Sequence, residues 1–492
     1  MQQSKERREL SRSSARGGVI TMAATAVKVA VQLLSTVVLA RLLTPDDYGV
    51  LGMVTSFTVF ASLFKDLGLS SAAIQVKDLT RAQQTNLFWI NTGFALLLTV
   101  VVAAAAPALA AFYGRAELTG MTLILSTTFL LTGLSAQHNV MLVRAMRFGP
   151  QAIANIAGAL FNFGTAMTLA LTGWGVWALA WGLVAGAVTR TGLIWYLSPF
   201  MPGRWQRHAG TRKLLGFGAN VTVFNFANYF SRNLDSILIG KFVSSEALGY
   251  YSRANQLLMF PISNLRAPIE AVCYPALSKL QDDRKAWEEY YLNVVRLLAC
   301  LSMPIAAWLI VTADSFVPLV LGAQWNGSVP LIRILSIVCF IQPSASLMGT
   351  ALLSQGRSRA FLVQGLAVSL VVSAGFGLGT VWGATGVAWS YVVTSYLVLV
   401  PTLINTYRGT SLKVGDFFRS VAFPALVSAG VAGCLALLKQ DQELGTSPVD
   451  FALLSFAFLA GIALCLFLFP QGRELVRQGR QLTRSLYSSK RK

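Results

Sequence analysis

The sequence predicts an all-α polytopic membrane protein of about 14 transmembrane helices. Of its 492 residues, 54% are hydrophobic and only 12% are charged, whereas soluble domains are about 25% charged. Apolar runs of about 20 residues recur along the whole chain, and each is long enough to cross a hydrocarbon core of about 30 Å. The runs do not alternate with polar residues as strands do, and only helices satisfy their own backbones within such a core.

The apolar runs define the predicted spans and their limits. They are 17–41, 48–70, 84–112, 118–142, 149–172, 175–198, 213–240, 246–275, 289–312, 328–352, 359–380, 384–407, 417–438 and 449–469. The fifth and sixth spans are separated only by Thr-Gly-Trp-Gly, which is typical of a tight turn.

The lysines and arginines predict the orientation of these spans. Of the 40 basic residues, 28 lie in one alternating set of loops and in the two termini, and 4 lie in the opposite loops: Arg41, Arg115, Lys241 and Lys439. Cytoplasmic loops carry such an excess of basic residues. We therefore expect a multi-pass protein of the bacterial inner membrane with an even number of spans and both termini in the cytoplasm.

One sequence pattern occurs twice in the chain, which predicts two lobes. Arg41 to Val50 reads RLLTPDDYGV and Lys241 to Tyr250 reads KFVSSEALGY, a displacement of 200 positions. We interpret both stretches as hairpin turns outside the cytoplasm, with acidic residues accepting backbone hydrogen bonds and a glycine relaxing the steric limits. Six spans return the chain to the same side, so the lobes form a parallel repeat with a site between them.

The predicted organisation follows from this repeat. It comprises a basic cytoplasmic N-terminus (1–16), an N-lobe of six helices (17–198), a cytoplasmic linker (199–212), a C-lobe of six helices (213–407), two further helices (408–469) and a basic cytoplasmic tail (470–492).

Polar residues form stripes on the first, second, seventh and eighth spans. Steps of three and four place them on one face of each helix, and charges inside a membrane usually face protein or a wet cavity. The predicted binding residues are Lys28, Gln32, Lys65, Asn225, Asn228, Arg232, Arg253 and Arg266, and the predicted ion-coupling or ion-pairing acids are Asp66, Asp235 and Glu270.

Two interpretations of the stripes remain open. The acids could pair with Lys65, Arg232 and Arg266 and tie the helices together, or the stripes could line a central cavity. Lys28 and Arg253 have no acid nearby in the sequence, and the five basic residues exceed the three acids by two. A cationic cavity rich in hydroxyl and amide groups suits an anionic, polyhydroxylated ligand such as a phosphate-linked sugar.

Other classes of function find little support. The chain has no soluble basic domain for nucleic acid and no cluster of residues for catalysis, a metal or a cofactor. The glycine motifs at 375–379 and 182–186 predict close helix packing. The alternatives are a multidrug or cation antiporter, disfavoured by the cationic excess, and a membrane polysaccharide polymerase or ligase, disfavoured by the short loops.

Two long stretches resemble one known family. Residues 40–75, which begin ARLLTPDDYGV, and residues 235–283, which begin DSILIGKFVSSEALGYYSRANQL, resemble hairpins of Wzx-type lipopolysaccharide and exopolysaccharide flippases. This is the polysaccharide-transport branch of the multidrug/oligosaccharidyl-lipid/polysaccharide exporter superfamily.

The resemblance implies a non-enzymatic flippase that moves undecaprenyl-diphosphate-linked oligosaccharide between leaflets by alternating access. It implies two six-helix lobes with two extra helices, a lipid-linked substrate, membrane lipids and polymerase or export proteins as partners, and no cofactor. A related lipid-linked precursor flippase implies diphosphate binding for Lys28, Arg232, Arg253 and Arg266. Some relatives couple to H⁺ or Na⁺ through acids of the second lobe; here the eleventh and twelfth spans lack acids, which leaves Asp235 as the candidate.

Overall fold

The structure is a computed structural model that describes residues 2–62, 73, 76, 79–207, 233–442 and 448–473. Side chains are described from residue 21 onward, apart from residues 60, 62 and 440–442. All regular structure within this part of the chain is helical, which confirms the predicted fold class. The chain divides into two compact units, Met1–Gly249 and Tyr250–Lys492.

The first unit is built from long helices that follow the predicted spans. They are α1 (Gln2–Leu42), α2 (Pro45–Ser62), α4 (Arg81–Tyr113), α5 (Glu117–Arg144), α6 (Phe148–Leu171) and α7 (Val176–Leu197). Consecutive helices pack as pairs, α4 on α5 and α6 on α7, and α1 packs along α6. The connection between α6 and α7 is the predicted tight turn, with positive φ at Gly173 and Gly175.

The linker after α7 is fastened to the helices of its own unit. Asn86 of α4 donates to the carbonyl of Gln206 at 2.7 Å and accepts the Gln206 N–H at 3.0 Å. The indole of Trp89 donates to the carbonyl of Gly203 at 2.9 Å. Residues 203–206, expected to serve only as a connection, therefore run along the first turns of α4.

The second unit begins within α9 (Ser245–Lys279), whose first turn belongs to the first unit. Its other helices are α10 (Arg284–Val320), α11 (Ser328–Ala345), α12 (Leu347–Ser354), α13 (Ser358–Gly379), α14 (Gly383–Tyr407), α15 (Val414–Gln442) and α16 (Pro448–Leu468). Short 3₁₀ turns, Ala323–Trp325 and Thr380–Trp382, precede α11 and α14. The helix α10 is central, since it packs against α11, α15 and α16.

Ten segments of the described chain are long and apolar enough to cross a membrane. Two of them contain two helices each: Ser328–Ser354 contains α11 and α12, and Ser358–Tyr407 contains α13 and α14. The helices α2 and α9 are not among the ten. Both carry predicted polar stripes, and α9 alone includes Glu246, Arg253, Arg266, Glu270 and Lys279. The polar residues of α9 lie within the described chain, whereas the charged residues predicted for the second span, Lys65 and Asp66, lie outside it.

Candidate functional site

The structure describes six of the eleven predicted site residues. Lys28, Gln32, Arg253, Arg266, Asp235 and Glu270 lie within the described part of the chain. Lys65, Asp66, Asn225, Asn228 and Arg232 lie outside it.

Lys28 and Gln32 lie on an exposed face of α1. Both side chains are exposed, and Lys28 forms no ion pair among the described residues. The hydroxyls of the same helix point inward to its own backbone: Thr36 donates to the carbonyl of Gln32 at 2.8 Å.

The cationic face of α9 is partly neutralised within the second unit. Nε of Arg266 lies 3.4 Å from Oε1 of Glu270, one turn later, and the two side chains are 32% and 29% exposed. Glu270 also accepts a hydrogen bond of 2.8 Å from the hydroxyl of Ser346, between α11 and α12. Arg266 and Glu270 thus pair within one helix, whereas the alternative interpretation of the stripes expected such pairs to tie helices together.

Arg253 lies nearer the N-terminus of α9 and is half-buried. Its guanidinium donates to Oε1 of Gln256, one turn along α9. Steps of three and four residues on a helix place side chains on one face. This contact therefore keeps an arginine and an amide together on the predicted polar stripe.

Asp235 is buried in the helical residues that precede the second turn. Its Oδ1 accepts the N–H of Ser236 at 2.7 Å. Burying a carboxylate is costly unless it is hydrogen-bonded or paired, which makes Asp235 a defined acidic position and not a chance surface charge.

The two predicted hairpin turns contact each other directly. A Cβ built on Gly49 would lie 1.7 Å from the carbonyl oxygen of Ser245, and one built on Gly249 would lie 1.9 Å from that of Pro45. The contact is reciprocal, because each glycine meets the residue equivalent to the one that its counterpart meets. The two turns, 200 positions apart in the sequence, therefore meet through equivalent residues.

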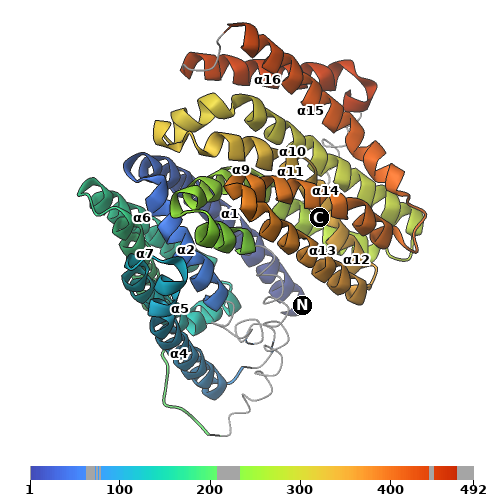
Figure 1. The fold of residues 1–492 in the computed structure, drawn as a ribbon. Helices are drawn as coiled ribbons and strands as arrows, with labels where there is room; N and C mark the ends of the chain where they lie inside the picture. Colours follow the sequence, from blue (N-terminus) through green and yellow to red (C-terminus); the bar gives the residue numbers. More distant parts are fainter. Residues whose placement is uncertain are drawn as a thin grey trace. The chain divides into compact units, whose positions relative to one another are not determined.

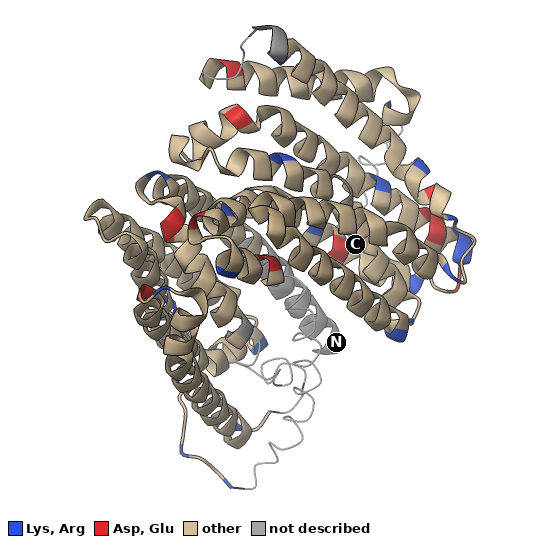
Figure 2. Ribbon diagram, viewed as in Figure 1, with Lys and Arg blue, Asp and Glu red and all other residues tan. Residues whose placement is uncertain are grey.

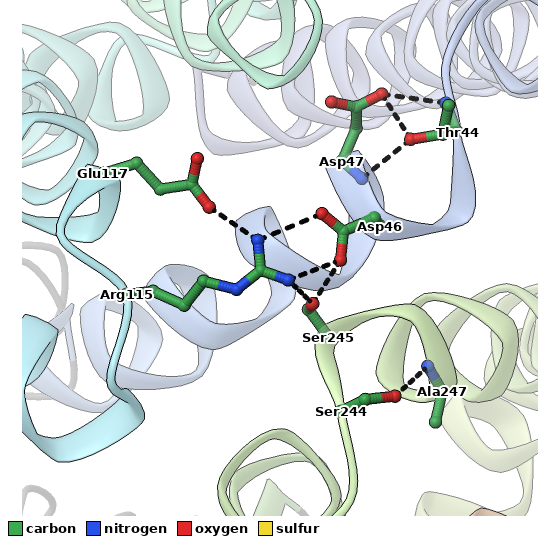
Figure 3. A network of polar contacts seen from close by, with 8 residues as sticks. All are labelled: Thr44, Asp46, Asp47, Arg115, Glu117, Ser244, Ser245 and Ala247. Carbon is green, nitrogen blue, oxygen red and sulfur yellow. Dashed lines mark hydrogen bonds and ion pairs between the residues drawn. The ribbon is translucent and has the colours of Figure 1, made fainter.

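An arginine outside both turns ties them together (Figure 3). Arg115, between α4 and α5, contacts Asp46 at 2.8 and 3.2 Å and Glu117 at 2.9 Å. It also donates to the hydroxyl of Ser245, which in turn donates to Asp46. The hydrogen bond with Asp46 is the main cause that raises the pKa of Arg115, so the guanidinium stays charged in this network.

The local structure of the first turn differs from the sequence interpretation. Only Leu43 and Thr44 interrupt the helices, and Pro45 already begins α2. The hydroxyl of Thr44 accepts the N–H of Asp47 at 3.2 Å, and the carboxylate of Asp47 accepts the N–H of Thr44 at 2.8 Å, so the two residues cap the start of α2. Gly49 lies within this helix, where its lack of a side chain permits close approach; the interpretation of it as a turn residue was wrong.

Two charged groups within the helices were not singled out from the sequence. Nε of Arg190 in α7 donates to Oδ1 of Asn155 in α6 at 2.8 Å. Asp314 of α10 accepts from Arg333 of α11 and, at 2.6 Å, from Lys439 of α15. Arg190 and Arg333 are isolated charges in apolar runs, and this isolation could have marked them as candidates in the sequence. Their partners lie on other helices, so the sequence does not reveal the contacts.

Charged residues occupy few positions in the middle of the described helices (Figure 2). Lys28 and Gln32 belong to the first unit, whereas Arg253, Arg266 and Glu270 belong to the second. The common cavity for the two sets stays a prediction.

Known proteins similar to this chain are biosynthesis proteins by name. A family model described as "Polysaccharide biosynthesis protein" matches residues 38–330. The teichuronic acid biosynthesis protein TuaB of Bacillus subtilis is 27% identical over 92% of this chain and 95% of its own length. The lipopolysaccharide biosynthesis protein WzxC of Escherichia coli is 24% identical over 83% of this chain and 85% of its own.

Solved structures share the fold at low sequence identity. The lipid II flippase MurJ in an inward closed conformation has a TM-score of 0.75, 12% identity and coverage of 93% of this chain and 100% of its own. An inward-facing transporter of the multidrug MATE family has a TM-score of 0.63, 15% identity and coverage of 77% and 94%. The predicted polytopic architecture is thus confirmed by proteins that move substrates across membranes.

Proposed function

Because the chain belongs to the polysaccharide biosynthesis protein family, we propose that it is a flippase for undecaprenyl-diphosphate-linked oligosaccharide units. The substrate crosses the bacterial inner membrane from the cytoplasmic to the outer leaflet by alternating access, and the protein performs no covalent chemistry. The family match over residues 38–330 is the observation that carries this proposal. It includes the two turns, α2 and the striped helix α9.

The chemistry of α9 supports an anionic substrate. Arg253 and Arg266 present planar guanidinium groups, which bind phosphate oxygens with two parallel hydrogen bonds. A diphosphate gains more from Arg266 than Glu270 does, because it carries a higher charge and more acceptor oxygens. Lys28, Arg232 and Lys65 are assigned to the same diphosphate, and Gln32, Asn225 and Asn228 to the hydroxyls of the sugar.

Ion coupling is assigned to the acids of the polar stripes. Asp235 is the first candidate for H⁺ or Na⁺, because it is buried and bound to a backbone N–H. If it couples transport to an ion gradient, Asp235→Asn abolishes the dependence of translocation on that gradient. Translocation that still follows the gradient in this variant would exclude Asp235.

The fold shared with multidrug transporters does not favour a drug substrate. The structural similarity is at 15% identity and concerns the fold alone. An antiporter for organic cations requires an anionic site, whereas the described residues of the predicted site include three basic groups, Lys28, Arg253 and Arg266, against two acids, Asp235 and Glu270.

Translocation of a fluorescent undecaprenyl-diphosphate oligosaccharide in proteoliposomes tests the function. We expect the wild-type protein to expose the sugar on the opposite side, and Arg253→Ala and Arg232→Ala to lose this activity while inserting at normal levels. Arg419→Ala is the matched control, because Arg419 lies on α15, is 87% exposed and pairs only loosely with Asp416 at 3.7 Å. Full translocation by the first two variants would sink the assignment of the cationic site.

A further inference from the structure

Three charged side chains meet between α10, α11 and α15 of the second unit, and none of them belongs to the predicted binding site. Asp314 of α10 accepts a hydrogen bond from the guanidinium of Arg333 on α11 and one of 2.6 Å from the ammonium of Lys439 on α15. Both donors contact the same carboxylate oxygen, Oδ2. We call these three residues the Asp314 cluster. Because two cations share one carboxylate, the cluster carries one excess positive charge.

The two cations keep hydrogen-bond donors that no described residue uses. A guanidinium has five N–H groups and an ammonium has three. Besides its contact with Asp314, Arg333 donates from Nε to the carbonyl of Ile310 at 3.3 Å, and Lys439 donates to that of Val311 at 3.4 Å. Most N–H groups of Arg333 and one of Lys439 therefore have no partner among the described residues. The two side chains are 44% and 20% exposed, so an anion can reach them.

The shared oxygen also places two like charges next to each other. Like charges at close range repel, whereas a nearby opposite charge stabilises both. Ion pairs between side chains exposed to this degree contribute little to stability, so a tie between helices does not account for two cations placed within apolar helices. A second anion beside Arg333 and Lys439 would neutralise the excess charge.

The Asp314 cluster lies close to one end of its helices. Asp314 is six residues before the last residue of α10, Arg333 is five residues after the first residue of α11, and Lys439 is three residues before the last residue of α15. At about 1.5 Å per residue these separations are about 5–9 Å. The helices α10 and α15 have 37 and 29 residues, so both are longer than a hydrocarbon core of about 30 Å. Their last turns therefore reach the layer of the lipid headgroups.

The charge at this end is unusual for the side of the membrane on which it is predicted to lie. Lysines and arginines are depleted outside the cytoplasm, and Lys439 is one of only four basic residues in the loops assigned to that side. Arg333 lies within the predicted span 328–352, and charges inside spans usually mark a function. Because both residues act against the predicted orientation, a role in orientation does not explain them.

Aromatic rings occupy the same stretch of α10 as the cluster. Trp308 and Phe316 of α10 pack against each other and against Phe451 of α16, with ring centroids 5.4, 5.9 and 6.1 Å apart. The indole N–H of Trp308 donates to the hydroxyl of Ser455 on α16 at 3.0 Å. Tryptophans are enriched at the boundary between membrane and water. This composition is typical of a membrane interface, where lipid phosphates lie.

We propose that the Asp314 cluster binds the phosphate group of a lipid in the outer leaflet. A guanidinium and an ammonium side by side donate to phosphate oxygens, and basic pockets between membrane helices bind lipid headgroups. The phosphate supplies the missing negative charge and joins α11 and α15 to α10. Glycerophospholipids and undecaprenyl phosphate both carry this group. The inference goes beyond the proposed function and does not depend on translocation.

Native mass spectrometry of the full chain in detergent tests this site. The probes are dioleoylphosphatidylglycerol and undecaprenyl phosphate, each compared with its phosphate-free counterpart, dioleoylglycerol or undecaprenol. We expect the wild type to retain at least one phosphate lipid several-fold more than its counterpart, and Arg333→Gln and Lys439→Gln to lose this excess. The phosphate lipid that shows the excess identifies the source of the ligand. Arg419→Gln is the matched control, because it removes the same charge near the opposite end of α15 and should keep the excess.

Asp314→Asn separates phosphate binding from a purely structural role. The change removes both ion pairs and leaves the two cations without a carboxylate. We expect this variant to retain the phosphate lipid several-fold more than the wild type does, and the added lipid to raise its thermal midpoint more. A cluster that only ties helices together predicts lower stability with unchanged or lower retention. Asp416→Asn is the matched control, because Asp416 also pairs with a basic residue, and it should leave retention unchanged.

Three results would overturn the inference. The first is equal retention of both phosphate lipids by the wild type, Arg333→Gln and Lys439→Gln. The second is an equal loss in Arg419→Gln, which would show adsorption to any basic surface. The third is lower retention by Asp314→Asn than by the wild type.

Discussion

At the scale of single residues, short polar contacts define how helices begin and where charges are held. Thr44 and Asp47 exchange three hydrogen bonds at the start of α2, of 2.7, 2.8 and 3.2 Å. At the equivalent start of α9, the hydroxyl of Ser244 accepts the N–H of Ala247 at 3.0 Å. The first cap is therefore the stronger of the two, although both follow the same sequence pattern.

We predict that Thr44→Ala lowers the stability of the protein more than Ser244→Ala does. Loss of such a cap costs about 1 kcal/mol, and Thr44→Ala removes two of the three hydrogen bonds at its site and leaves Asp47 with only a backbone donor. The measurement is the midpoint of thermal unfolding in detergent for both variants and for the wild type. An equal or larger shift for Ser244→Ala would contradict the ranking.

A second prediction at this scale concerns Arg115, which contacts residues at the starts of α2, α5 and α9. Arg115→Gln keeps part of the side chain but removes the charge that faces Asp46 and Glu117. We expect faster proteolysis or hydrogen exchange of the residues at the start of α9, including Ser245, with little change at the start of α13. Unchanged exchange near Ser245 would show that the glycine contacts hold the two turns without the arginine.

At the scale of helices, the two similar stretches of the sequence form the starts of α2 and α9, which contact each other. Pro45 and Gly49 of α2 meet Ser245 and Gly249 of α9 so closely that no Cβ fits at either glycine. Glycine in a helix costs roughly 0.5–1 kcal/mol relative to alanine. Both Gly49 and Gly249 carry this cost, because only a residue without a side chain lets the two helix backbones approach so closely.

Gly49→Ala and Gly249→Ala are expected to disrupt this crossing. Each added methyl would overlap a carbonyl oxygen that belongs to helix backbone and cannot rotate away. We predict a large loss of thermal stability or of correctly inserted protein for each. Gly93→Ala is the control, since nothing lies within 4 Å of its Cβ position in α4, and it should leave stability equal or raised by up to about 1 kcal/mol. Similar behaviour of all three variants would refute the close contact.

The same comparison shows what sequence can predict for an element. The glycine motifs at 375–379 and 182–186 indicated close packing, which is confirmed: Gly379 faces the backbone of Gly386, and Gly186 that of Gly158. The start of α2 was also available, because Thr-Pro before acids is a helix N-terminus, yet it was interpreted as a turn. Local periodicity and capping depend on residues that are neighbours in the chain, so both can be predicted from the sequence.

Contacts between distant segments could not be predicted from the sequence in the same way. The partner of Gly49 lies near residue 245, and the partner of Arg190 is Asn155 on the preceding helix. The linker residue Gln206 is held by Asn86. A single sequence gives each residue's chemistry but no distance between segments, so the polar stripes could be assigned to helices while their common cavity stays a prediction.

At the scale of the whole molecule, the distribution of charge decides how the chain lies in the membrane. Basic residues near cytoplasmic ends are favoured because they meet the anionic inner leaflet and resist translocation. In one loop predicted to be cytoplasmic, Arg357 donates to the carbonyls of Asn405, Thr406 and Arg408 at 2.9, 3.2 and 2.9 Å. The connection between α6 and α7, by contrast, carries no charge at all.

Accessibility of single cysteines in intact cells tests this orientation. In a variant whose five native cysteines are replaced by alanine, Trp174→Cys lies in the uncharged connection after α6, and Ser358→Cys lies beside Arg357. Both positions are exposed, so burial does not limit labelling at either. We expect a membrane-impermeant maleimide, admitted through a permeabilised outer membrane where there is one, to label position 174 in intact cells and position 358 only after lysis of the inner membrane. The reverse pattern would invert the predicted topology, and with it the prediction that both termini lie in the cytoplasm.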